Sequence, residues 1–182
     1  MKNFYIRFKT IFDFLFALIS LILGLPLFLL IILLIKFSSR GPIFFTQTRL
    51  GKNHKPFKCI KFRTMHPEAE VILDNLIKNN LNLKKEFEET HKLKNDPRIT
   101  NIGKFLRKTS LDEIPQFINV LKLEMSIVGP RPIVEEEIEK YGVSISKVLS
   151  TKPGMTGLWQ VSGRNNLSYK RRVGLDCFYV NN

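Results

Sequence analysis

The stretch "FLFALISLILGLPLFLLIILLI", Phe14 to Ile35, contains no charged residue over about 22 positions. Roughly 20 apolar residues are enough for a helix to cross a bilayer. Pro26 interrupts the stretch near its middle, because proline removes a backbone N–H and its ring clashes with the carbonyl four residues earlier. Lys and Arg lie close to both ends of the stretch, at Lys2, Arg7, Lys9, Lys36, Arg40 and Arg49.

Lys and Arg beside a membrane segment favour the cytoplasmic side. A single spanning helix would export one basic flank, whereas a helix that enters, breaks at Pro26 and returns keeps both flanks inside. We therefore predict a re-entrant membrane helix within residues 1–40, in preference to a single span or a cleaved signal peptide.

The remaining residues, 41–182, have the composition of one basic cytoplasmic domain. The chain of 182 residues carries 29 Lys and Arg against 16 Asp and Glu, a formal net charge of +13. Such a charge indicates an anionic partner, either nucleic acid, an anionic membrane surface or a phosphorylated substrate. Its two cysteines, Cys59 and Cys177, have no paired spacing, which argues against a disulfide framework or a zinc site.

Local patterns predict an α+β fold, in which the re-entrant helix precedes a small helical domain with a β-hairpin and short strands. The segments 42–49 and 57–64 predict the hairpin, and alternation places Lys61 and Arg63 on one face of its second strand. Helices are predicted from Pro67, from a cap near Thr100, and from Ser110. The stretch "EMSIVGPRPIV" predicts a short strand and a rigid loop, and the glycine-rich tail from residue 152 predicts a binding loop.

Asp112 and Glu113 are adjacent acids in this basic chain. Ser110-x-x-Glu113 fits a capping box, and acids also suit the first turn of a helix, so a structural role is a full alternative. Arg107 precedes the pair, and the loops "GPRP" with Arg131 and "SGRN" with Arg164 follow it. Arginines near a helix start suit phosphate, two carboxylates with phosphate oxygens suit Mg²⁺, and a carboxylate is able to attack phosphorus. The residues by themselves predict metal-assisted phosphoryl chemistry at a membrane surface.

Four motifs in order resemble the bacterial monotopic phosphoglycosyl transferases, also called polyprenyl-phosphate sugar-1-phosphate transferases. These are "IFDF" with the proline-broken apolar helix, "FTQTRLGKNHKPFKCIKFRTM", "NDPRITNIGKFLRKTSLDEIPQFINVLKLEMSIVGPRPIV" and "KPGMTGLWQVSGRN". They cover nearly the whole chain and look most like the undecaprenyl-phosphate galactose phosphotransferase branch.

The resemblance implies transfer of a sugar-1-phosphate, such as galactose-1-phosphate, from a UDP-sugar to undecaprenyl phosphate. UMP would be released, Mg²⁺ would be the cofactor, and the protein would act at the cytoplasmic face of the bacterial inner membrane. This reaction initiates the assembly of exopolysaccharide, capsule, lipopolysaccharide or another glycoconjugate.

Matching motifs also imply residue roles. Asp112 would be the nucleophile and Glu113 its partner at the metal. Phosphates would be gathered by Arg63, Arg107 and Arg131, and the nucleotide would be held by Lys61, Pro153, Gly154 and Arg164.

Two departures from the family pattern concern the ends of the chain. Larger members of the galactose branch begin with extra membrane helices and a further domain, and members normally continue past "CFYVNN" into an interfacial helix. The sequence therefore also fits an inactive member truncated at its C-terminus. A membrane-tethered polyanion binder is a third interpretation, but the arginines here flank acids and lie in Gly/Pro loops, which argues against nucleic acid. Nothing in the sequence names the sugar, and a homo-oligomer is compatible with it.

Overall fold

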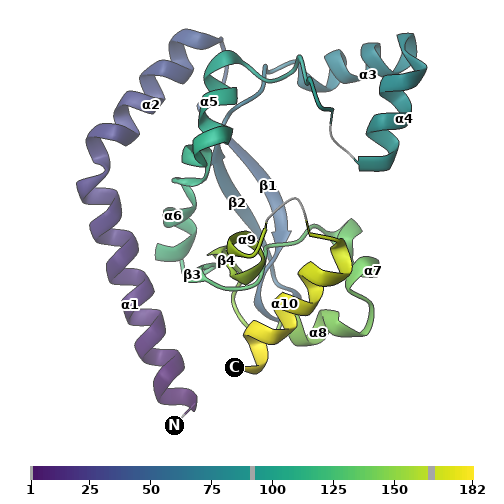
Figure 1. Cartoon of the computed structure of the whole chain (residues 1–182). Coiled ribbons are helices and arrows are strands. Elements are labelled where there is room, and N and C mark those ends of the chain that lie inside the picture. The colour runs from purple at the N-terminus through teal and green to yellow at the C-terminus, as the bar shows by residue number, and fades with distance from the viewer. Residues whose placement is uncertain (1, 91–92, 164–166) are drawn as a thin grey trace. The chain divides into compact units, whose positions relative to one another are not determined.

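The computed structural model describes residues 2–90, 93–163 and 167–182 (Figure 1). Contacts divide the chain into two compact units. The first comprises Met1–Pro26, Thr46–Lys61 and Pro115–Asn182, and the second comprises Leu27–Phe45 and Phe62–Ile114. The domain boundary near residue 40 stays a prediction.

The first unit contains helices, short 3-10 turns and most of the β-hairpin. Its elements are α1 (Lys2–Leu23), most of β1 (Phe44–Leu50) and β2 (Pro56–Phe62), η1 (Lys52–His54), α6 (Gln116–Leu121), β3 (Ser126–Val128), η3 (Glu135–Glu137), α7 (Ile138–Tyr141), η4 (Gly142–Ser144), α8 (Ile145–Val148), β4 (Gly154–Thr156), α9 (Leu158–Val161) and α10 (Tyr169–Asn181). The pairing of β1 with β2 confirms the predicted hairpin.

Two apolar clusters form the core of the first unit. One joins α1, β2 and α6 through Ala17, Phe57, Cys59, Val120 and Met125. The other lies among α7, α8 and α10 and contains Ile133, Tyr141, Val148, Leu149 and Val173. The amide of buried Asn119 connects α6 to β2, because it donates to Lys58 O (2.8 Å) and accepts from Ile60 N (3.0 Å).

A parallel pair, β3 with β4, completes the first unit, with Ser126 opposite Gly154 and Val128 opposite Thr156. The tail from residue 152 therefore forms β4, α9 and α10, where a binding loop was predicted. The glycines that suggested a loop instead allow two backbones to approach each other closely.

The second unit contains nearly all of α2 (Leu25–Ser38), together with α3 (Ala69–Asn79), α4 (Leu81–Thr90), α5 (Asn101–Thr109) and the turn η2 (Leu111–Glu113). Its core cluster consists of Ile31, Ile35, Phe62 and Leu106. The predicted cap of α5 is confirmed, since Gly103 N donates to Thr100 Oγ1 at 2.9 Å.

The apolar N-terminal stretch breaks at Gly24, two residues before the predicted Pro26. Pro26 instead occupies the first turn of α2, where a missing backbone N–H costs no helical hydrogen bond. Within the described residues, no one helix has the length and hydropathy to cross a bilayer. The helices Phe4–Leu23 and Leu25–Ser38 meet those criteria only together, as a pair bent by 64°.

The close contact of α5 with residue 64 gives a prediction about Gly103. A Cβ at Gly103 would lie 1.9 Å from the Thr64 backbone oxygen. Gly103→Ala should therefore lower the free energy of unfolding by about 1–3 kcal/mol, as overpacking does. The matched control is Gly174→Ala in α10, where no described atom lies within 4 Å of the added Cβ. That variant should gain up to about 1 kcal/mol from helix propensity. Thermal unfolding of both variants tests this, and equal stability of the two would contradict the contact.

Candidate active site

Asp112 and Glu113 lie on the 3-10 turn η2, between α5 and α6, and both are half-buried. Leu111 and Ile114, on either side of the pair, pack against the core cluster of the second unit. The apolar neighbours therefore fix the turn, and both carboxylates remain partly accessible to solvent.

The predicted capping box at Ser110 is wrong. Ser110 adopts a left-handed conformation (φ 59°, ψ 16°) and ends α5 as its C-cap. Its side chain makes no capping hydrogen bond to any residue that the structure describes, and Glu113 N instead bonds the Ser110 backbone oxygen at 3.2 Å. The helix α6 begins only at Gln116, with Pro115 as its N-cap. The Ser110 half of the predicted capping box is therefore absent, and both acids lie in the first turn of η2 instead.

Arg107, in the last turn of α5, is coupled electrostatically to Asp112. Its Nε donates to Thr64 Oγ1 at 2.9 Å, which fixes the base of the guanidinium. Partial burial lowers the pKa of Arg107, while the carboxylates of Asp112 and Asp96 raise it. The negative charge of Asp112 therefore lies close enough to Arg107 to interact with it.

Arg63 is buried and bonded to the end of α2. Its guanidinium donates to Arg40 O at 2.9 Å, Ser39 O at 2.8 Å and Ser39 Oγ at 2.9 Å, and burial lowers the pKa of Arg63. These bonds satisfy carbonyls that a helix C-terminus leaves open. The observed contacts are those of a helix cap, and the phosphate role of Arg63 stays a prediction. Lys61 lies in β2, two residues before Arg63, and is half-buried.

In the first unit, the pairing of β3 with β4 brings the loop of Arg131 beside Pro153 and Gly154. Gly154 N donates to Pro130 O at 2.8 Å, and Ser126 N donates to Pro153 O at 2.8 Å. A Cβ at Gly154 would lie 2.1 Å from Gly129 N, so only glycine permits this approach. The segment around Arg131 and the segment around Gly154, which are far apart in sequence, thus lie side by side.

The side chain of Arg131 is held by an aromatic ring and a carboxylate. Its guanidinium carbon lies 5.4 Å from the centre of the Trp159 ring, and its Nη2 lies 3.9 Å from Glu137 Oε1. Arg49 shares the same carboxylate, with Nη1 3.6 Å from Glu137 Oε2. The pKa of Arg49 is lowered by burial and then by the charge of Arg131. Arg49 and Arg131 are thus two cations that share the carboxylate of Glu137.

Asp176 in α10 holds the backbone of the same loop. It is 1% exposed, accepts from the Tyr141 hydroxyl at 3.1 Å and accepts a hydrogen bond from the backbone of Arg131. Burial raises the pKa of Asp176 to about 6, and these two hydrogen bonds oppose the rise. Sequence reasoning missed this support, together with Arg49, Glu137 and Trp159. Their positions in the motifs "FTQTRLG" and "GLWQV" were the available signal for Arg49 and Trp159.

The predicted site residues fall into two groups, each within one unit. Arg63, Arg107, Asp112 and Glu113 belong to the second unit, and Lys61, Arg131, Pro153 and Gly154 belong to the first. Arg164 lies outside the described residues.

The fit of a metal ion rests on the adjacent carboxylates. In the part of the chain that the structure describes, no group of three His, Cys, Asp or Glu side chains gathers to hold a metal ion. Asp112 and Glu113 supply two carboxylates, which matches Mg²⁺ when substrate phosphates and water complete its shell. The donor set therefore fits Mg²⁺ bound together with a phosphorylated substrate.

Comparison with known proteins places the chain in a family. A family model described as "Bacterial sugar transferase" matches residues 4–182. The chain is 49% identical over 174 residues to the exopolysaccharide production protein ExoY of Rhizobium meliloti, covering 96% of this chain and 77% of the relative. It is 48% identical over 175 residues to an undecaprenyl-phosphate galactose phosphotransferase of Salmonella typhimurium, covering 96% of this chain and 36% of the relative. A UDP-glucose:undecaprenyl-phosphate glucose-1-phosphate transferase of Klebsiella pneumoniae is 37% identical over 181 residues, covering 95% and 36%.

The raised pKa of Asp176 gives a prediction about stability against pH. Because the native state binds this proton more tightly than the unfolded chain, the contribution of Asp176 to stability should fall as the pH rises from about 4 to about 6. Asp176→Asn lacks this titration and still accepts hydrogen bonds, so its loss of stability between pH 4 and pH 7 should be smaller, by up to about 3 kcal/mol. Urea unfolding at several pH values measures the difference, with Glu139→Gln, which changes an exposed side chain of α7, as control. Parallel curves for wild type and Asp176→Asn would contradict the raised pKa.

Proposed function

Because the chain belongs to the bacterial sugar transferase family, the phosphoglycosyl transferases, we propose that this transferase moves a sugar-1-phosphate from a UDP-sugar to undecaprenyl phosphate and releases UMP. The observation that carries the proposal is the half-buried Asp112-Glu113 pair on η2, with the charge of Arg107 acting on Asp112. The named relatives support the lipid carrier and a hexose, since one is named for galactose and another for glucose. We favour galactose-1-phosphate, in an initiating step of surface polysaccharide assembly.

In the first half-reaction, a carboxylate oxygen of Asp112 attacks the β-phosphorus of the UDP-sugar. An O–P bond forms, the bond between the β-phosphorus and the bridging oxygen breaks, and UMP leaves with that oxygen. The product is an acyl phosphate that joins Asp112 to the sugar-1-phosphate. Arg107 offsets the negative charge that gathers on the phosphoryl oxygens.

In the second half-reaction, an oxygen of the lipid phosphate attacks the same phosphorus. The bond to Asp112 breaks, the carboxylate is regenerated, and the sugar is left on undecaprenyl diphosphate. No proton has to be removed in either half-reaction, because a carboxylate and a phosphate each attack as an anion. The problem that the protein must solve is therefore the repulsion between like charges.

The remaining residues bind and orient the substrate in this proposal. Arg131, prearranged by Trp159 and Glu137, grips phosphate oxygens as a fork. Lys61, Pro153 and Gly154 serve the nucleotide, and Arg164 is assigned there by its motif alone. When held by Asp112 and Glu113, Mg²⁺ neutralises charge on the phosphate oxygens.

We also place the protein on the cytoplasmic face of the bacterial inner membrane, through a re-entrant α1–α2 pair. Support comes from the basic residues on both sides of the apolar stretch and from large apolar side chains exposed along α1 and α2, among them Phe8, Phe12, Ile19, Leu29 and Leu33. Exposed apolar surface of this extent is typical of membrane or partner contact.

The covalent intermediate is tested by Asp112→Asn. Asn keeps the shape of the side chain but lacks the anionic oxygen, so it cannot form the acyl phosphate. Full-length protein in detergent is incubated with UDP-sugar labelled in the sugar, with Mg²⁺ and without lipid acceptor. Wild type should retain label and Asp112→Asn should not, while UMP release with acceptor should fall at least a thousandfold, roughly the size of effect found when a catalytic nucleophile is removed.

The matched control for this experiment is Asp74→Asn, which removes an exposed acid of α3 in the same unit. It should label and turn over like wild type. Labelling of Asp112→Asn at the wild-type level would move the nucleophile elsewhere. Wild-type turnover without any labelled protein would show direct transfer instead, and an inactive wild type would favour the inactive-member interpretation.

The metal is tested separately by chelation. EDTA should abolish UMP release and added Mg²⁺ should restore it. Glu113→Gln removes one of two proposed carboxylate ligands, so its Mg²⁺ concentration for half-maximal rate should rise at least tenfold, in line with the loss of a metal-site residue. Full activity of the chelated wild type would overturn the assignment of Mg²⁺.

A further inference from the structure

The face of α1 that contacts the rest of the first unit combines polar and small side chains with Phe16, whose ring centre lies 6.3 Å from that of Phe117 in α6. Asp13 is 6% exposed and Ala17 is 0% exposed, and α1 packs on α6 and β3. The large apolar side chains of α1 are exposed instead, among them Phe4, Phe8, Ile11, Phe12, Leu15 and Ile19. The N-terminal half of α1 is therefore held to the unit largely by polar contacts.

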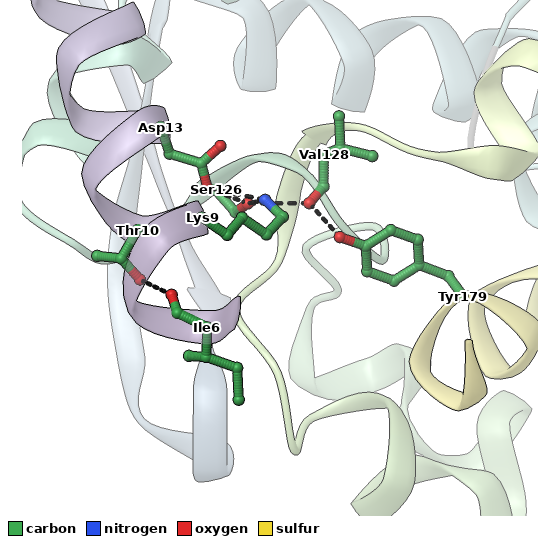
Figure 2. A network of polar contacts seen from close by, with 7 residues as sticks. All are labelled: Ile6, Lys9, Thr10, Asp13, Ser126, Val128 and Tyr179. Carbon is green, nitrogen blue, oxygen red and sulfur yellow. Dashed lines mark hydrogen bonds and ion pairs between the residues drawn. The ribbon is translucent and has the colours of Figure 1, made fainter. Parts of the chain in front are cut away.

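These contacts form a network between α1 and β3 (Figure 2). Lys9 Nζ donates to Asp13 Oδ2 at 2.8 Å, one helical turn apart. The hydroxyl of Ser126, the first residue of β3, donates to the same Asp13 oxygen at 2.6 Å, and Lys9 also donates to the Ser126 hydroxyl. Each of the three side chains thus contacts the other two.

The other end of β3 is fixed as well. The backbone oxygen of Val128 accepts a hydrogen bond from the Tyr179 hydroxyl of α10 at 2.7 Å, and it lies 2.9 Å from Ser126 Oγ (Figure 2). Arg131 follows Val128 by three residues, between Pro130 and Pro132. Because each proline fixes its own φ, this short connection has few soft dihedrals. A displacement of β3 should therefore displace the backbone of Arg131 by a similar amount.

We propose that Lys9, Asp13 and Ser126 form a polar lock that seats α1 on β3 and so positions the Arg131 loop for the phosphates of the UDP-sugar. The residues of the lock are positioning residues, and their effect on substrate rests on the function proposed above. The lock couples α1, whose large apolar side chains are exposed, to the Arg131 loop, which binds substrate in the proposed function.

Physical arguments favour positioning over a purely stabilising role. A partly buried ion pair contributes little net stability, because desolvation of the two charges offsets their attraction. What it does supply is a unique register, since apolar contacts alone tolerate sliding and rotation of a helix. An ionisable side chain within an apolar helix is also costly, which favours a functional reason for Asp13.

The test compares Asp13→Asn with the double variant Lys9→Gln/Asp13→Asn, both as the full chain in lipid nanodiscs. Asp13→Asn leaves Lys9 with an unpaired charge, and the double variant removes that charge without restoring the ion pair. Three kinds of measurement are made on each variant. They are the melting temperature, the hydrogen-exchange rate of the backbone amides in residues 126–132, and KM and kcat for the UDP-sugar.

Asp13→Asn should lower the melting temperature, speed exchange in residues 126–132 and raise KM by about tenfold, with a smaller change in kcat. The double variant should recover the melting temperature but not the exchange protection or KM. Ser126→Ala, which removes the hydroxyl without unbalancing charge, should reproduce the changes in exchange and KM. It also serves as the test if Asp13→Asn does not fold.

The matched control is Thr10→Val, because the Thr10 hydroxyl donates only within α1, to Ile6 O at 2.8 Å (Figure 2). It should behave as wild type in all three measurements. Recovery of exchange and KM along with the melting temperature in the double variant would overturn the positioning role, as would unchanged exchange and KM in Ser126→Ala. If wild type shows no turnover, the proposed function fails, and the exchange rates still decide whether the lock exists.

Discussion

The first unit depends on β3, a strand of three residues to which four other elements attach. The strand β4 pairs with it in parallel, α1 bonds its first residue Ser126, α6 packs beside it, and Tyr179 of α10 bonds its last carbonyl. So many contacts fit on so short a strand because Gly129 and Gly154 let the flanking backbones approach closely. The backbone contacts of the surrounding strands therefore position Arg131, independently of the contacts of its side chain. Rigid support of this kind is what a binding residue needs to meet a ligand without reorganising.

The helix α1 has the opposite pattern to an ordinary surface helix, with apolar side chains outside and polar ones toward the protein. In water this arrangement would leave a broad apolar surface uncovered, at a cost of about 25 cal/mol per Å² of that surface. In a lipid environment the apolar side is solvated, and packing must rely on small residues and hydrogen bonds. Ala17 and the Lys9, Asp13 and Ser126 contacts supply both. The observed packing of α1 thus supports the membrane location that we propose.

Sequence patterns predicted those features that depend on neighbours along the chain. The hairpin follows from two aromatic and β-branched segments around a short polar turn, and the start of α5 follows from the Thr100 cap. Features that depend on distant partners were missed. The glycine-rich tail became β4 because β3 pairs with it, and the guanidinium of Arg63 is bonded to carbonyls more than twenty residues away. Ser110 shows a third limit of prediction from local sequence. The sequence around Ser110 suits the start of a helix, but its left-handed φ ends α5 there instead. The acidic pair and the Arg131 loop were predicted, whereas Glu137, Trp159 and Asp176, which hold that loop, were not.

The acidic pair in a chain of net charge +13 has a physical explanation in the proposed reaction. A carboxylate that approaches a diphosphate meets like charge, and at 4 Å two unit charges repel by about 4 kcal/mol at an effective dielectric constant of 20. A second negative nucleophile, the lipid phosphate, meets the same barrier in the second half-reaction. The charge of Arg107, which interacts with Asp112, offsets part of this repulsion. In the proposed reaction, the basic excess of the chain and the pair of acids on η2 thus serve the same step. Cations lower the cost of bringing anions together, and in the reaction that we propose the carboxylate is the anion that attacks.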